Sequence, residues 1–360
     1  MDFKSFETFH RIDAPGLIAN LRREGTPDRV YHIELFQDFE IEEAVDKHYH
    51  VTAHLDRSDP HFNKRRSIAM QRFLGYDFVG LPLLSLPTDS WQIANDTTSD
   101  AQNRGDRSWI NEKEGVITSW DDFERYPWPD GQTWDTRDLE WFDANLPDDM
   151  CLVGRGGHFC EYLCWLMGYE TLCFALYEQR DLVEAIAAKV LELELAAARV
   201  MLQSKRLGIW WASDDLGFNT GLMISPDDTR QLVLSGHKAL ASLVHQDGHP
   251  YLLHACGNRS DIMEELITDV KLDAIHSWED KIESICDAKI AYGDRIAILG
   301  GIDVGFLCTA DETAIRDRVR LTISTCQPGG GFCLGSGNTV ANYIPLKNYL
   351  IMLDEGRRYQ

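Results

Sequence analysis

The residues best suited to chemistry are a histidine and two cysteines in the C-terminal half of the chain. His254 and Cys256 are two residues apart, and in an extended strand such residues point to the same face. Cys333 closes the glycine-rich run 329–333, and Glu279 lies just past another expected strand. The ends of neighbouring barrel strands can share one centre. Catalytic zinc takes three protein ligands and a displaceable fourth. We therefore expect His254, Cys256 and Cys333 to form a zinc site, to which Glu279 could add a carboxylate.

Two further residues are candidates for catalysis beside this expected site. Asp215 follows a predicted strand. Its carboxylate could bind a polar group of the substrate or accept the second ring N–H of His254, and capping of the following turn is the structural alternative. His276 ends another predicted strand and is either a proton donor at the rim or a packed core residue.

Four polar residues near predicted strand ends are candidates for substrate binding. Arg155 and His158 stand at the end of the third predicted strand, and Asp303 and Asn338 follow the seventh and the eighth. A guanidinium there could hold a substrate carboxylate, as an aromatic acid would require. A surface ion pair is the structural alternative for Arg155.

The strands that must position these residues recur along the chain. From residue 207 onward, short apolar runs alternate with longer amphipathic ones, as successive strand–helix units do. In chain order the expected strands are 30–35, 77–81, 151–155, 207–213, 250–254, 272–275, 295–299 and 331–334. Eight units predict an α/β fold of the closed (β/α)8 TIM barrel type. The alternative, an open doubly wound sheet, requires a Gly-x-Gly-x-x-Gly turn after the first strand that the sequence lacks.

One segment does not follow this alternation of strands and helices. Residues from about 85 to 148 are rich in tryptophan, and we expect an insertion between the second and third strands that covers the barrel mouth. Its tryptophans are Trp91, Trp109, Trp120, Trp128, Trp134 and Trp141. With an N-terminal extension before the first strand, residues 1–360 are expected to form a single barrel domain.

Composition restricts the partners and the compartment. The 35 Lys and Arg against 58 Asp and Glu give a net charge of −23, which argues against nucleic acid and anionic membranes as partners. No apolar stretch approaches the roughly 18 to 20 residues of a membrane span. Nine cysteines and no leader-like start indicate a reducing, cytoplasmic environment. A homodimer is compatible with all of this.

Several motifs together resemble a known family. They are the His254-x-Cys256 pair, Cys333 after its glycine-rich run, the Asp-Asp-Leu-Gly turn at 214–217 and the Leu-Gly-Gly-Ile-Asp strand end at 299–303. The chain resembles the uroporphyrinogen decarboxylase superfamily. Within it, the chain is similar to the zinc- and corrinoid-linked methyltransferases, such as methylcobamide:coenzyme M methyltransferases and phenyl methyl ether O-demethylase methyltransferases. The resemblance implies a (β/α)8 barrel.

The departures from true decarboxylases concern substrate recognition. Those enzymes carry an arginine-rich Arg-Gln-Ala-Gly-Arg-Tyr type segment near the N-terminus, which this sequence lacks. They also carry a late histidine, where this chain has Ser336. A polycarboxylate substrate also suits a strongly acidic chain poorly.

The resemblance implies a zinc-dependent methyltransferase. Zinc would activate a thiol, or the oxygen of a methoxylated aromatic, for methyl transfer to or from the cobalt of a corrinoid. The sequence has no Asp-x-His-x-x-Gly cobalamin segment, so we expect a separate corrinoid protein as partner. The direction of transfer stays open. The alternatives are a metal-free decarboxylase and a non-catalytic barrel that binds a small molecule.

Overall fold

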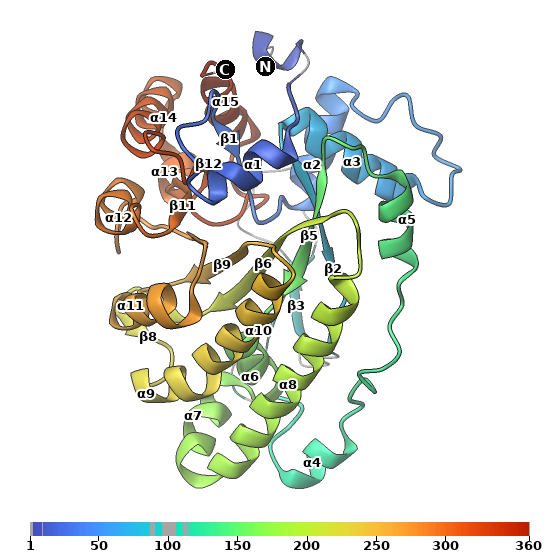
Figure 1. The fold of residues 1–360 in the computed structure, drawn as a ribbon, viewed down its shortest axis with the longest axis vertical. Coiled ribbons are helices and arrows are strands. Elements are labelled where there is room, and N and C mark those ends of the chain that lie inside the picture. Colours follow the sequence, from blue (N-terminus) through green and yellow to red (C-terminus); the bar gives the residue numbers. More distant parts are fainter. Residues whose placement is uncertain are drawn as a thin grey trace.

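The computed structural model describes residues 3–8, 10–86, 91–95, 106–110, 113 and 115–359. Its centre is one curled sheet of eight strands in the order β1-β12-β11-β10-β9-β6-β5-β2, and every neighbouring pair is parallel (Figure 1). The strands are β1 (Tyr31–His32), β2 (Phe78–Pro82), β5 (Cys151–Gly156), β6 (Leu207–Asp215), β9 (Tyr251–Cys256), β10 (Ala274–His276), β11 (Ala297–Ile302) and β12 (Phe332–Ser336). From β2 to β12, each strand of this sheet pairs with the next one along the chain, and β1 pairs with β12, as successive strand–helix units require. The predicted TIM-barrel type of fold is thereby confirmed.

The ring of strands has one opening that the sequence did not predict. β1 and β2 are the two edges of the sheet, and within the described part of the chain no ladder joins them. β1 is only two residues long and pairs through Tyr31 and His32 with β12. Backbone hydrogen bonds of the described residues therefore leave the ring open between its first and second strands.

Helices surround the sheet, with α8 packed on β5, α10 on β9, α12 on β11 and α15 on β12 (Figure 1). The helices of this layer are α2 (Phe39–Tyr49), α3 (Phe62–Leu74), α6 (Phe159–Met167), α7 (Tyr169–Glu178), α8 (Arg180–Met201), α9 (Pro226–Asp228), η2 (Thr229–Leu234), α10 (Ser235–Gln246), η3 (Ser260–Ile262), α11 (Met263–Glu265), η4 (Leu266–Val270), α12 (Ile285–Tyr292), α13 (Val304–Thr309), α14 (Glu312–Cys326) and α15 (Leu346–Gly356). Side-chain capping fixes where some of them start. The Ser225 hydroxyl accepts the N–H of Asp228 at 3.1 Å and Pro226 opens α9, a favoured combination at a helix N-terminus.

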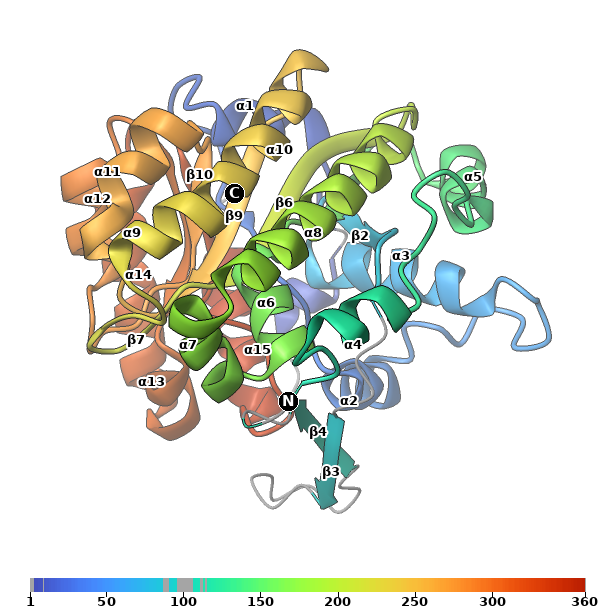
Figure 2. The ribbon, with the colours of Figure 1, turned by 90° about the horizontal axis from the view of Figure 1, so that it is seen from below.

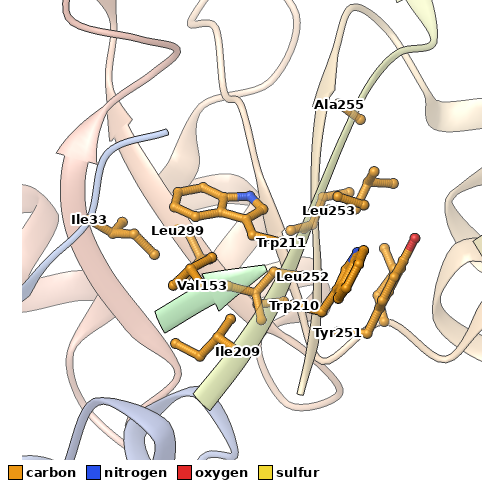
Figure 3. Close-up of a cluster of buried hydrophobic side chains, with 14 of the residues drawn as sticks. Ile33, Val153, Ile209, Trp210, Trp211, Tyr251, Leu252, Leu253, Ala255 and Leu299 are labelled. Atoms are coloured by element: carbon orange, nitrogen blue, oxygen red, sulfur yellow. The ribbon is translucent and has the colours of Figure 1, made fainter. Parts of the chain in front are cut away.

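Alternation along the strands separates an inner from an outer core. The consecutive residues Trp210 and Trp211 of β6 are both fully buried but point to opposite sides of the strand (Figure 3). Trp211 lies inside the barrel near Val153 and Leu299, whereas Trp210 stands beside Tyr251 (Figure 3). The residues of β6 that share the side of Trp211, two and four positions later, therefore point into the barrel as well.

The segment between β2 and β5 carries an antiparallel hairpin and two short helices, namely β3 (Trp91–Asn95), β4 (Asp106–Ile110), α4 (Trp120–Arg125) and α5 (Arg137–Asn145). The hairpin extends away from the sheet (Figure 2). Trp128, Trp134 and Trp141 pack half-buried against the core, and Trp120 is exposed. The side chains of Trp91 and Trp109 lie outside the described residues. A cover over the barrel mouth stays a prediction.

The N-terminal extension, with η1 (Lys4–Phe6) and α1 (Ala14–Leu21), lies at the end of the barrel where the strands begin. A buried ion pair holds this end, because Arg29 Nη2 contacts Asp77 Oδ1 at 2.5 Å and both side chains are almost fully buried. The same oxygen accepts the N–H of Asp13 at 2.6 Å. Asp77 immediately precedes β2, so this pair ties the extension to the sheet.

We expect Asp77→Ala to lower the free energy of unfolding by about 3 to 5 kcal/mol, because it leaves the Arg29 guanidinium buried without its counter-charge. Glu264→Ala, which breaks a surface ion pair with Arg295, is the control and should cost less than about 1 kcal/mol. Urea unfolding measures both. Equal losses would show that burial does not distinguish the two pairs.

Candidate metal centre

Three side chains with metal-binding groups meet at the C-terminal ends of β6 and β9. Asp215 is the last residue of β6, and His254 and Cys256 lie near the end of β9. One potential ligand atom from each lies within 4.8 Å of the other two. The parallel register pairs Asp215 with Cys256, and Ser213 with His254, so both strands turn these residues to the inner face together.

The first contacts of this group are polar. His254 Nε2 lies 3.2 Å from Cys256 Sγ. Asn338, two residues past the end of β12, donates from Nδ2 to the same sulfur at 3.3 Å. The structure places its amide against the cysteine, and the predicted role of Asn338 in substrate binding stays a prediction.

A chain of hydrogen bonds fixes which nitrogen of His254 is free. The Ser336 carbonyl can only accept, so His276 Nε2, 3.2 Å away, carries a proton. Burial lowers the pKa of His276 to about 3 and that of His254 well below its usual value, so both rings are neutral at pH 7. His276 Nδ1 then accepts from His254 Nδ1, 2.7 Å away. The lone pair of His254 is left on Nε2, facing Cys256, which is the tautomer a metal ligand needs.

Burial disfavours the charged forms of the two acidic members of the group when no cation is present. Burial raises the pKa of the Cys256 thiol well above its usual value, and neighbouring Asp215 raises it further. Burial also raises the pKa of the Asp215 carboxyl. A bound divalent cation would supply the opposite charge, so its binding would displace the proton of the Cys256 thiol.

Cys333 does not reach this group, which corrects its expected position at the end of the last strand. β12 continues to Ser336, so Cys333 is the second residue of its strand. It lies about 10 Å further down the strand than Ser336. Its fully buried thiol accepts from Asn20 of α1 at 3.4 Å, at the opposite end of the barrel from the Asp215 group.

Glu279 and Asp303 also lie outside the group. Glu279 lines a separate cavity of about 370 Å³, together with Arg259 and Trp278. Asp303 is the N-cap of α13. Its Oδ1 accepts the N–H of Phe306 at 2.8 Å, and its Oδ2 accepts the N–H of Asp280 at 3.1 Å. These contacts give Asp303 a structural role.

The two remaining predicted residues lie in and just after β5, the strand that pairs with β6. Arg155 and His158 line a cavity of about 390 Å³. His158 Nδ1 lies 2.7 Å from the Glu161 carboxylate, and burial, with help from nearby Asp215, raises the pKa of Glu161 well above its usual value. Glu161 was not predicted, because nothing in its helix sequence marks it.

The neighbouring aspartates of β6 have different tasks. Asp214 is fully buried and accepts the N–H groups of Cys160 and Glu161 at the start of α6, at 2.9 and 2.8 Å. It also contacts His237 Nε2 at 3.0 Å. Strand alternation thus makes Asp214 a helix cap and leaves Asp215 for the inner face. Alternation was the signal in the sequence that could have separated the two.

The fold and this rim site define an α/β barrel with a histidine, a cysteine and a carboxylate at the ends of adjacent strands. The family model of uroporphyrinogen decarboxylase (URO-D) matches residues 120–359, so the chain belongs to the uroporphyrinogen decarboxylase family. The predicted family is thereby confirmed.

One solved structure supports the fold, and a second resembles this chain more distantly. A methyltransferase from Methanosarcina mazei superposes with a TM-score of 0.67 at 19% sequence identity, over 97% of this chain and 99% of that one. A Listeria monocytogenes protein assigned as a vitamin B12-independent methionine synthase gives 0.47 at 12% identity, over 92% and 95%. A sequence comparison with curated proteins finds no match. No helix in the described part of the chain is long and apolar enough to cross a membrane.

The hydrogen-bond chain predicts the tautomers of the metal-free protein. We expect His276 protonated on Nε2 and His254 on Nδ1 at neutral pH, because the Ser336 carbonyl orients both rings. Long-range ¹H–¹⁵N correlation spectra, assigned with His276→Gln and His254→Gln variants, would measure this. A proton on Nδ1 of His276 would contradict this sequence of hydrogen bonds.

Proposed function

We propose that this protein is a zinc-dependent methyltransferase, which moves a methyl group between a small substrate and the cobalt of a corrinoid carried by a partner protein. The observation that carries the proposal is the convergence of Asp215, His254 and Cys256 with the free lone pair of His254 aimed into the group. Family membership and the similarity in fold to a methyltransferase agree with it.

The donor set suits zinc. His254 Nε2, Cys256 Sγ and one Asp215 oxygen would be the three protein ligands, and this mixture of nitrogen, sulfur and oxygen is typical of Zn²⁺. Three protein ligands leave a fourth position for the substrate, as catalytic zinc requires. In this proposal Asp215 is the third protein ligand, in place of Cys333, which we expected from the sequence.

When bound, zinc would act as a Lewis acid on the thiol or ether oxygen that gives or takes the methyl group. The protein side chains hold that geometry. His276 orients the His254 ring through its Nδ1, and Asn338 donates to the Cys256 sulfur, which favours the thiolate. Asp215 serves as ligand, so we assign no general base.

A decarboxylase is the weaker reading. Ser336 stands where decarboxylases carry their late histidine, and its hydroxyl is buried and donates to Glu34 at 2.6 Å. It therefore offers no titratable group to the barrel mouth. The corrinoid protein is proposed as a partner with basic residues at its surface, because a net charge of −23 favours encounter with such a protein.

Metal content tests the ligand set. Protein purified without chelators should hold about one zinc per chain, measured by plasma mass spectrometry. The His254→Ala and Cys256→Ser variants should lose this zinc, and Asp215→Asn should bind zinc more weakly, because each removes a ligand. Cys333→Ser is the matched control and should keep its zinc. Loss of zinc in Cys333→Ser, with Asp215→Asn unaffected, would favour the set expected from sequence.

Zinc affinity should increase with pH. The Cys256 thiol is protonated at neutral pH because burial raises its pKa, so binding must release that proton, and the dissociation constant should fall about tenfold for each pH unit. Competition with a chromophoric chelator between about pH 6 and pH 8 measures this dependence. A flat profile would mean that the thiolate is already formed without metal.

Methyl transfer tests the function itself. Zinc-loaded protein mixed with cob(I)alamin and methoxyarenes, or with methylcobalamin and thiols, should change the visible spectrum of the corrinoid, whereas Cys256→Ser should not. A zinc-loaded protein that transfers methyl in neither direction with any donor or acceptor would favour a binding role.

A further inference from the structure

The cavity of about 390 Å³ lies where the sheet is not closed between β1 and β2. It is lined by residues that follow β1, by β2, and by the inner face of β5 and β6. Small-molecule sites are commonly of this size. Those of its lining residues that enter the argument are Glu34, Phe36, Phe78, Gly80, Arg155 and Ser213.

Arg155 spans the opening. Its Nη2 donates to the Leu35 carbonyl beyond β1 at 2.7 Å, and its guanidinium carbon lies 4.5 Å from the centre of the Trp211 ring. Nη1 is buried and has no hydrogen-bond partner among the described residues. A buried, unpartnered donor on a charged group is costly, and a ligand in the cavity would complete it.

The charge of Arg155 is also uncompensated. Burial alone lowers its pKa to about 9, so it remains a cation at pH 7, and the described residues provide no carboxylate in an ion pair with it. Buried Arg29, in contrast, pairs with Asp77. Arg259 and Arg357 also form no ion pair within the described part of the chain, but each donates to at least two backbone carbonyls.

The acids that line the cavity do not oppose an anion there. Both Glu34 oxygens accept from Ser336, each at 2.6 Å. Burial raises the pKa of Glu34 to about 8, so this carboxyl is mostly neutral at pH 7. Glu42, at the edge of the cavity, pairs with Arg66 at 3.0 Å.

The shape of the cavity favours an anion with an apolar body over a bare inorganic one. Phe78 forms a buried wall and Phe36 is 52% exposed at its edge. Gly80 leaves room for the guanidinium, since a Cβ there would lie 2.7 Å from Arg155 Nε.

The cavity leads to the metal group. Ser213, in its lining, pairs in register with His254 and lies two residues before Asp215 on the same face of β6. On the barrel side, Trp211 packs edge-on against His276, with ring centroids 5.5 Å apart. A ligand fixed at Arg155 therefore extends along β6 toward the site of methyl transfer.

We infer that this cavity binds a small organic acid with an apolar or aromatic body, whose carboxylate is held by Arg155. That this acid is the methyl-transfer substrate rests on the proposed function, whereas its binding does not.

The test compares benzoate with benzamide, which share a ring but differ in charge, by titration calorimetry on metal-free protein. Benzoate should bind about 10- to 100-fold more tightly, as expected for one charged hydrogen-bonded contact. Arg155→Met should remove this preference. Arg230→Met, which alters an exposed arginine paired with Glu265, is the control and should keep it.

A second variant guards against misfolding. Gly80→Ala crowds the Arg155 side chain without removing its charge, and it should also weaken benzoate binding while the circular dichroism spectrum stays unchanged. Equal affinity of the unaltered protein for benzoate and benzamide, or undiminished benzoate binding by a folded Arg155→Met variant, would overturn the inference.

The outcomes separate this inference from the proposed function. Arg155-dependent benzoate binding without any methyl transfer would keep the acid site and refute the methyltransferase. Methyl transfer from neutral methoxyarenes, together with equal affinity for benzoate and benzamide, would support the methyltransferase and refute the acid site.

Discussion

The parallel register between β6 and β9 is the constraint on which the site depends. It sets Asp215 opposite Cys256, and Ser213 opposite His254. Because both strands alternate with the same period, one register brings a carboxylate, an imidazole and a thiol to one face. A shift of one residue would turn the Asp215 side chain outward and bring Asp214, the helix cap, into the barrel.

Burial gives this arrangement its chemical character. The His254 and His276 rings are neutral because water is excluded from them, and the Ser336 carbonyl then dictates where each proton resides. The same exclusion raises the pKa of Cys256. The Cys256 thiol therefore keeps its proton at neutral pH when no cation is bound. Arg155, in contrast, is a buried cation for which the described residues provide no carboxylate in an ion pair.

Much of the fold was predictable from the sequence, because strands and helices leave different periods in the order of apolar residues. All eight strands were located, and the His-x-Cys pair was placed on one face by alternation alone. The opening between β1 and β2 was not predicted, since the 30–35 segment reads as a full strand but only Tyr31–His32 forms a ladder. Whether a segment pairs as a strand depends on which strand lies beside it in the folded protein.

The sequence by itself determined the barrel type, the family and the pairing of His254 with Cys256, because each depends on local spacing. Only the tertiary structure decided that Asp215 completes the group and that Cys333 lies at the other end of the barrel. Alternation fixes the face of a residue within its strand. The height of residues on different strands depends on strand tilt, register and the point where each strand stops, and these are set by packing across the whole barrel.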